Sequence, residues 1–169
     1  MGAVTTTRQT AVAVDEDAQY LTFMLGGEMF AIGILGIKEI IEYGSLTVVP
    51  MMPAFVRGVI NLRGAVVPVV DLEARFGGRP TRVGPRTCIV ILEVCADEDT
   101  QVLGVVVDAV SEVLEIAAAD IRPAPAFGSR LAPHFIAGMV KSEDGFLTLL
   151  DVAQVLDVQE LANLAQAAS

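Results

Sequence analysis

Two aspartates, Asp71 and Asp151, come closer to a catalytic pair than any other residues of this sequence. Each follows an apolar stretch and stands thirteen residues after a glycine, Gly58 or Gly138. Two carboxylates from related halves of a chain can share a proton, as in aspartic proteases. That arrangement requires each aspartate to be followed by Thr or Ser and then Gly, whereas Leu-Glu and Val-Ala follow here. We therefore expect each aspartate to end a strand and to cap a helical turn.

The other residues that could do chemistry are isolated. The single histidine, His134, lies in a proline-rich segment with no cysteine nearby, so neither a zinc site nor a Ser-His-Asp triad is indicated. Cys88 and Cys95 are seven residues apart, a spacing that fits no metal or redox motif, and we expect small apolar residues in a reducing compartment. The sequence has no glycine-rich phosphate-binding motif. It therefore predicts no enzyme, no metal and no cofactor.

The overall charge and hydropathy restrict the classes of partner. Eleven basic residues face 21 acidic ones, which gives a formal net charge of −10, and this charge disfavours nucleic acid and anionic membrane surfaces. Hydrophobic residues make up 53% of the chain, yet no apolar run reaches the ~18 residues that cross a bilayer. Residues 1–10 show no secretory apolar segment. We expect a cytoplasmic protein whose apolar residues fill a core or an interface.

Short strands separated by glycine and proline dominate the sequence. The period-2 patterns predict strands at 20–25, 29–32, 56–62, 66–72, 87–95, 103–107 and 146–150, with turns at Gly26-Gly27 and Arg63-Gly64. Residues 34–42 fit a helical stripe or an isoleucine-rich strand equally well. Helical segments are predicted at 72–76 and 152–168, and a proline-rich loop at 120–133. This pattern is typical of β-barrels or sandwiches.

An internal repeat is visible in the sequence. Residues 53–58 recur at 133–138 with a shift of 80, and residues 32–50 match 105–123 with a shift of 73. Self-similarity at a nearly fixed offset predicts two lobes of like topology. Because a lobe of ~65–80 residues buries little surface alone, we expect the lobes to share a core, with a groove between them.

A cationic hairpin lies between two apolar strands of the first half. Arg63 and Gly64 form its turn, and Arg57 lies six residues before Arg63. In so acidic a chain, an arginine at a hairpin tip is a candidate anchor for a partner protein. The alternative is that Arg63 is only solvated or pairs with a neighbouring acid.

The hairpin belongs to a longer segment, residues 55–72 (FVRGVINLRGAVVPVVDL), which resembles the signature of the CheW family of bacterial chemotaxis coupling proteins. The likeness extends over about 19–156. It implies a mainly β fold of two SH3-like five-stranded β-barrel subdomains packed around a shared core, with short helices and a C-terminal helix, and it favours a strand at 34–42. We expect a flexible tail at 1–18, a CheW-like domain at 19–156 with lobes at about 19–83 and 84–156, and a C-terminal helix or tail at 157–169.

The resemblance also implies a function. Proteins of this family are non-catalytic adaptors that couple methyl-accepting chemotaxis receptors to the histidine kinase CheA below the inner membrane. Whether this chain also assembles with itself in array rings is left open by the sequence. The receptor-binding residues implied here are Ile37, Glu39, Gly58 and Arg63. The implied docking face for the regulatory domain of the kinase comprises Gly104, Val105, Val107 and Asp108, in strands that could equally be core. The alternative is a stand-alone β-barrel that binds a small ligand between its lobes, and an enzyme ranks third.

Overall fold

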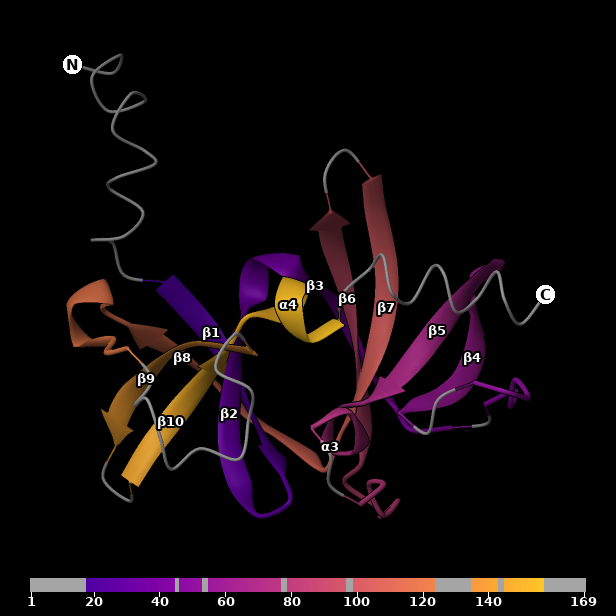
Figure 1. Ribbon diagram of the computed structural model, residues 1–169, viewed down its shortest axis with the longest axis horizontal. Coiled ribbons are helices and arrows are strands. Elements are labelled where there is room, and N and C mark those ends of the chain that lie inside the picture. The colour runs from indigo at the N-terminus through magenta and orange to yellow at the C-terminus, as the bar shows by residue number, and fades with distance from the viewer. Residues whose placement is uncertain are drawn as a thin grey trace.

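The computed structural model describes residues 18–44, 46–52, 55–76, 79–96, 99–123, 135–142 and 145–156, which form two five-stranded sheets (Figure 1). In one sheet the strand order is β8 (Ala109–Ile116), β1 (Ala18–Leu25), β2 (Glu28–Gly33), β10 (Gly145–Leu150) and β9 (Ile136–Ser142). In the other it is β3 (Ile37–Glu42), β6 (Cys88–Ala96), β7 (Asp99–Val107), β5 (Ala65–Asp71) and β4 (Val56–Leu62). The short helices are α3 (Leu72–Arg75) and α4 (Val152–Leu156), with 3-10 turns η1 (Ile34–Gly36) and η2 (Ala118–Asp120).

Several expectations fall on parts of the chain that the structure does not describe. These are the tail before Ala18, most of the proline-rich loop, His134 and the helix beyond Leu156. Ala18 itself, predicted as the end of the tail, is the first residue of β1.

The predicted tight turns are confirmed by backbone geometry. Gly26 and Gly27 have φ of 56° and 84°, and Arg63 and Gly64 have φ of 53° and 88°. Two successive positive φ values are the requirement of a two-residue hairpin turn that follows the twist of its strands. The Asn61 side chain accepts a hydrogen bond from the Gly64 N–H at 3.0 Å, which supports the left-handed conformation that Arg63 must adopt.

Two strands, β8 and β9, were not predicted from local pattern alone. Both correspond through the repeat to strands that were predicted, β8 to β3 by the shift of 73 and β9 to β4 by the shift of 80. The ambiguous segment 34–42 divides into the 3-10 turn η1 and the strand β3, so the strand expectation is right for its last six residues.

The sheets do not follow the predicted division into lobes at 19–83 and 84–156. The hairpin β1–β2 comes from the first half but pairs with β8 and β10 of the second half, while the hairpin β6–β7 pairs with β3 and β5 of the first half. The parallel pairs Ala31–Leu149 and Gly104–Val69 are related by the two repeat shifts. The repeat is therefore real, but each barrel takes one hairpin from the other half. Barrel 1 comprises β3–β7, and barrel 2 comprises β1, β2 and β8–β10.

Each sheet closes because the chain after its first edge strand crosses to the opposite edge. After β3, Thr47 pairs with Val59 of β4 through two hydrogen bonds of 2.9 Å. After β8, Arg122 pairs with Met139 of β9 through two hydrogen bonds of 2.8 Å. These bridges satisfy part of the edges that an open sheet would expose.

Three apolar clusters fill the molecule, one inside each barrel and one between them. Barrel 1 encloses Val69, Ile89, Ile91 and Val106, and barrel 2 encloses Ala31, Ile116, Leu147 and Leu149. The largest cluster draws on strands of both barrels and on α4, so the predicted shared core is confirmed. Within it, the Arg75 guanidinium lies between the rings of Phe55 and Phe135, at 4.8 and 5.3 Å, and donates a hydrogen bond to the Val155 carbonyl at 2.9 Å.

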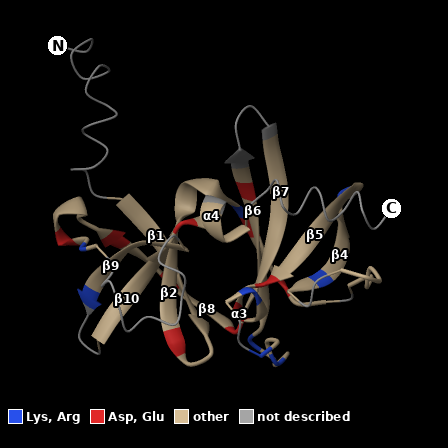
Figure 2. Cartoon of the chain, viewed as in Figure 1, with Lys and Arg blue, Asp and Glu red and all other residues tan. Residues whose placement is uncertain are grey.

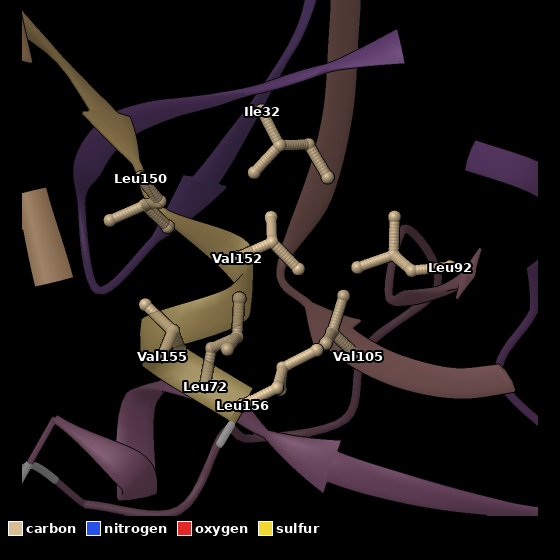
Figure 3. A pocket seen from close by; sticks show the side chains of 8 residues that line it. All are labelled: Ile32, Leu72, Leu92, Val105, Leu150, Val152, Val155 and Leu156. Carbon is tan, nitrogen blue, oxygen red and sulfur yellow. The ribbon is translucent and has the colours of Figure 1, made fainter. Parts of the chain in front are cut away.

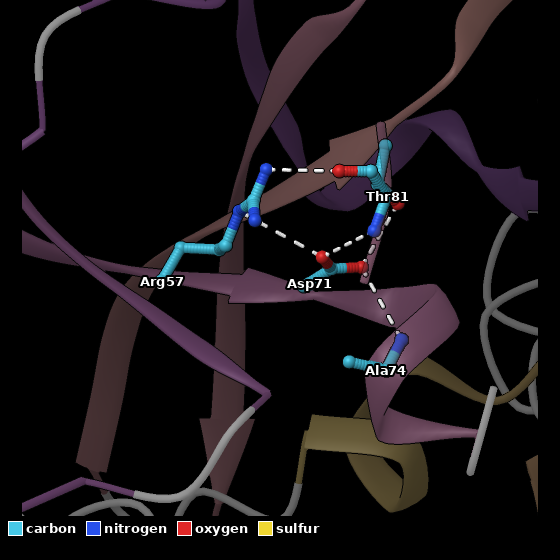
Figure 4. A network of polar contacts seen from close by, with 4 residues as sticks. All are labelled: Arg57, Asp71, Ala74 and Thr81. Atoms are coloured by element: carbon cyan, nitrogen blue, oxygen red, sulfur yellow. Dashed lines mark hydrogen bonds and ion pairs between the residues drawn. The ribbon is translucent and has the colours of Figure 1, made fainter. Parts of the chain in front are cut away.

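A buried carboxylate organises the end of β5 (Figure 4). Asp71 is fully buried, and its oxygens accept hydrogen bonds from the Thr81 N–H at 2.7 Å, the Thr81 hydroxyl at 2.9 Å and the Ala74 N–H at 3.3 Å. The Arg57 Nε lies 3.7 Å from the carboxylate, and its Nη2 donates to the Thr81 carbonyl at 3.0 Å. Asp71 thus caps α3, as predicted, and also fixes the segment that follows the helix. Its counterpart Asp151 caps α4 alone.

Replacement of Asp71 by Asn should therefore destabilise the fold. The substitution Asp71→Asn leaves Arg57 without its counter-charge and places an amide N–H₂ among donors, so the free energy of unfolding should fall by about 2–4 kcal/mol. Asp151→Asn, at the equivalent and less buried cap, should cost less than about 1 kcal/mol. Urea denaturation of the two variants measures the difference, and equal losses would contradict this account.

Candidate functional site

An exposed ion pair joins the two edge strands of barrel 1. Both guanidinium Nη atoms of Arg63, at the β4–β5 turn, donate to the carboxylate of Glu39 on β3, with the Nη2–Oε1 distance at 3.2 Å. The hydrogen bond from Arg63 lowers the pKa of Glu39, and the same bond raises the pKa of Arg63. The Arg63 side chain is 73% exposed, so a partner could reach the guanidinium. The pair is bidentate, the geometry in which arginine recognises carboxylates.

Exposed apolar residues lie near both members of the pair in the sequence. Ile40, which follows Glu39, is 42% exposed, and Val66, just beyond the Arg63 turn, is 68% exposed. Ile37 is partly buried and packs against the shared core, with a β-bulge between it and Glu39. The structure thus brings Glu39 and Arg63 together, with Ile37 on the same strand as Glu39. We call Ile37, Glu39, Ile40, Arg63 and Val66 the ion-pair surface.

Gly58, the fourth predicted receptor-binding residue, has a structural explanation. Its φ is 151°, and a Cβ atom there would lie 2.4 Å from the Thr47 carbonyl oxygen. A Cβ on the equivalent Gly138 would meet the Ile121 side chain at 2.4 Å. Both glycines therefore lie directly beneath the segments that close the barrels. Gly58 itself is buried.

Three of the four predicted kinase-docking residues, Gly104, Val105 and Val107, are buried. Val105 and Val107 are at most 1% exposed and pack in the shared core, and Gly104 is buried against Ile89. Their strand, β7, lies in the middle of its sheet with β6 on one side and β5 on the other, so its backbone groups are paired as well. The sequence pattern did not separate a buried central strand from a docking face, because both are rich in valine.

Asp108 holds the crossover between the barrels. Its carboxylate accepts a hydrogen bond from the Gly26 N–H at 2.8 Å, and its own N–H donates to the Met24 carbonyl at 2.9 Å. Glu73 of α3 faces the same turn, since a Cβ on Gly26 would lie 3.5 Å from its carboxylate. Burial, and then the charges of Asp108 and Asp71, raise the pKa of Glu73. This acidic group is a contact between the barrels.

A small pocket lies between the barrels and α4 (Figure 3). Its free volume is only about 10 Å³, and its lining residues are Ile32, Leu72, Leu92, Val105, Leu150, Val152, Val155 and Leu156. None of these side chains carries a polar group that could orient a ligand, and the volume is about what one water molecule needs, far below the roughly 300–1,000 Å³ of typical ligand sites. The geometry therefore gives little support to the small-ligand alternative. Among the helices that the structure describes, none is long and apolar enough to span a membrane.

Comparisons with known proteins agree with this architecture. Residues 19–163 match the family model described as CheW-like domain. The chain belongs to the CheW family. It is 36% identical over 144 residues to the chemotaxis protein CheW of Klebsiella aerogenes, covering 85% of this chain and 84% of that one. It is 30% identical to protein FrzA of Myxococcus xanthus, over 88% and 91% of the two chains.

A solved structure confirms the fold of this CheW-family protein. The scaffolding protein TtCheW from Thermoanaerobacter tengcongensis superimposes with a TM-score of 0.75 at 30% identity, over 83% of this chain and 88% of that one. The expected fold of two SH3-like five-stranded subdomains is therefore right. The family and its named members also assign this chain the role of a chemotaxis coupling adaptor.

Sequence reasoning did not find every residue that shapes the site. Neither Thr81 nor Arg75 was singled out from the sequence. Thr81 fixes the segment after α3, and Arg75 joins the two barrels. The repeat carried a usable signal: Arg57 and Arg75 correspond to Ala137 and Val155 in the second half. A charge present in only one copy of a repeat points to a contact that only one copy makes.

Substitution of Gly58 should act through folding. Gly58→Ala should lower the free energy of unfolding by about 1–3 kcal/mol, because the new methyl group overlaps the Thr47 carbonyl and φ is unfavourable. Gly33→Ala is the control, since a Cβ there meets nothing within 4 Å. The free energy of unfolding of Gly33→Ala should stay within about 0.5 kcal/mol of that of the original chain. Chemical denaturation decides, and an equally stable Gly58→Ala protein that fails to bind receptors would instead assign Gly58 a direct contact.

Glu73 should make stability depend on pH. Because its folded pKa lies above the unfolded value, ionised Glu73 disfavours the folded state at neutral pH, and this penalty disappears as the pH falls below the unfolded pKa. Glu73→Gln should therefore raise the melting temperature at pH 7, with a gain of less than about 1 kcal/mol in the free energy of unfolding. Near pH 3 the substitution should have no effect. Thermal melts at the two pH values test this, and a variant that is less stable at pH 7 would contradict it.

Proposed function

We propose that this CheW-family chain is a non-catalytic adaptor that couples methyl-accepting chemotaxis receptors to the histidine kinase CheA at the cytoplasmic face of the membrane. The observation that carries the proposal is the match to the CheW-like domain over residues 19–163. The structural likeness to TtCheW, itself described as a scaffolding protein, supports it. Three apolar clusters fill the two barrels and the space between them, which suits a rigid scaffold that acts through its surface.

The receptor contact in this proposal is the ion-pair surface. Arg63 and Glu39 hold each other in a fixed orientation, while Ile40 and Val66, near them in the sequence, add exposed apolar area. A helical receptor tip could gain affinity from the apolar side chains and orientation from the charges, as in other complexes in which a helix binds a groove. Arg63 supplies the anchor because part of its guanidinium stays exposed while it is paired.

The kinase contact in this proposal does not use the residues of β7. Gly104, Val105 and Val107 support the sheet from within, and Asp108 fixes the crossover. Their substitution would change kinase binding through the shape of barrel 1. We assign the kinase contact to exposed parts of the chain and name no residue for it.

Arg63 provides a direct test of the receptor contact. Arg63→Ala should leave the melting temperature unchanged, because a hairpin tip buries little, and should weaken receptor coupling by about ten- to a hundredfold. Co-sedimentation with receptor-containing membranes and kinase, followed by kinase activation, provides the measurement. Lys38→Ala is the control, since it removes a neighbouring exposed ion pair with Glu93, and it should couple normally.

A charge reversal separates a receptor contact from a purely internal role. The double variant Glu39→Arg with Arg63→Glu can restore the ion pair in the opposite orientation. If Arg63 only holds the edges of barrel 1 together, this variant will couple like the original chain. If Arg63 contacts the receptor, it will fold normally and fail to couple. Normal coupling by the reversed pair would refute the proposed contact.

A further inference from the structure

The segment after α3 is the most basic part of the described chain. Arg79, Arg82 and Arg86 are all exposed, and no acidic residue occurs between Glu73 and Glu93. Figure 2 shows this concentration of blue beside α3. The chain has a formal net charge of −10 with only 11 basic residues, so three arginines within eight residues form a local reversal of its charge. We call residues 79–86 the arginine loop.

The backbone of the arginine loop is fixed at two buried threonines. Thr81 is 3% exposed and makes two hydrogen bonds to the Asp71 carboxylate, while its carbonyl accepts from Arg57. Thr87 is 5% exposed, its hydroxyl accepts from the Gly84 N–H at 2.8 Å, and its carbonyl accepts from the Tyr43 N–H. Pro80 and Pro85 further restrict the backbone. A ligand therefore meets a loop whose backbone is already ordered.

The side chains of the three arginines make no polar contact within the described part of the protein. None of the three makes an ion pair or a side-chain hydrogen bond with another described residue. Val83, between Arg82 and Gly84, is 49% exposed and adds apolar area to the same loop. All three cations are arginines, whose planar guanidinium groups bind carboxylates in a bidentate manner that lysine does not match.

We propose that the arginine loop is a docking surface for a carboxylate-rich peptide segment of a partner protein. The segment supplies acidic side chains to Arg79, Arg82 and Arg86 and one apolar side chain to Val83. Charge complementarity selects it, because the loop concentrates positive charge on a chain whose formal net charge is −10. The fixed backbone limits the entropy lost on binding.

Other anionic partners fit the loop less well. Each basic residue near an anionic bilayer contributes about 1 kcal/mol of binding free energy, and segments that bind anionic lipid have clusters of 4–8 such residues. The arginine loop has only three, and the net negative charge of the rest of the chain is repelled by that surface. Nucleic acid is repelled for the same reason. A second copy of this chain would bring its own negative charge without a defined acidic segment opposite the loop. These partners are outcomes of the test below.

The arginine loop is separate from the ion-pair surface. Arg63 lies just before β5, whereas Asp71, which fixes the loop, ends that strand. Seven residues of strand put roughly 20 Å between the two ends at about 3.3 Å per residue. Both surfaces can therefore be occupied at the same time, and the loop does not depend on the proposed receptor contact.

The test compares two variants with the same change in net charge. In the loop variant, Arg79, Arg82 and Arg86 are each replaced by Gln. In the control, three exposed basic residues elsewhere are replaced by Gln: Lys38, Arg122 and Lys141. The probe is a fluorescein-labelled dodecapeptide that repeats Glu-Glu-Leu, and the reference peptide has Gln in place of Glu. Fluorescence anisotropy is measured at low and at high ionic strength.

The original chain and the control variant should bind the acidic peptide equally, and the loop variant about tenfold more weakly. The Gln peptide should not bind, and high salt should weaken binding of the acidic peptide. Equal binding by the loop and control variants would overturn the proposal. It would also be overturned if the loop variant bound the peptide normally but lost binding to phosphatidylserine vesicles, or lost self-association in sedimentation velocity.

Discussion

The parallel contact between the two sequence halves is the constraint on which the rest of this structure depends. Strand β5, from the first half of the sequence, pairs in parallel with β7 from the second half. In the same way, β10 from the second half pairs in parallel with β2 from the first half. Parallel pairing needs a long connection, so neither half can complete a barrel from local hairpins alone. The barrels must therefore fold together, and every surface built on one of them depends on both.

Differences between the two copies of the repeat indicate where the chain has specialised. Glu112 takes the place of Glu39, but the shift of 80 brings Glu143 to the place of Arg63, so the second half lacks the arginine that pairs with Glu39 in barrel 1. Similarly, Asp71 holds Arg57 and Thr81, whereas Asp151 only caps a short helix. Among the described residues, these side-chain polar contacts are made in barrel 1 and have no equivalent in barrel 2.

Most strands and the tight turns could be predicted because local rules govern them, and the shared core followed from the small size of each lobe. Alternating apolar residues and the turns at Gly26-Gly27 and Arg63-Gly64 specify hairpins wherever they occur. The exchange of hairpins could not be predicted, because the repeat gives equal patterns to both halves and does not say which half each hairpin joins. The status of Val105 and Val107 was left open between core and docking face for a related reason: a central buried strand and a docking strand share one composition. The family resemblance singled out Glu39 and Arg63 as receptor-binding residues, but it did not predict that these two residues, 24 positions apart, pair with each other.

A rigid scaffold suits an adaptor because its surfaces must keep their relative positions while several partners bind. The two surfaces of barrel 1 use the same strand as a spacer: the Arg63 turn begins β5, and the Asp71 network ends it. Asp71 is buried with its oxygens occupied by Thr81, Ala74 and Arg57, so the arginine loop is held by the core rather than by its own contacts. The buried Asp71 carboxylate thus both stabilises barrel 1 and holds the backbone segment that carries the exposed arginines. Changes in exposed arginines should alter binding alone, whereas changes at Asp71 should alter folding and binding together.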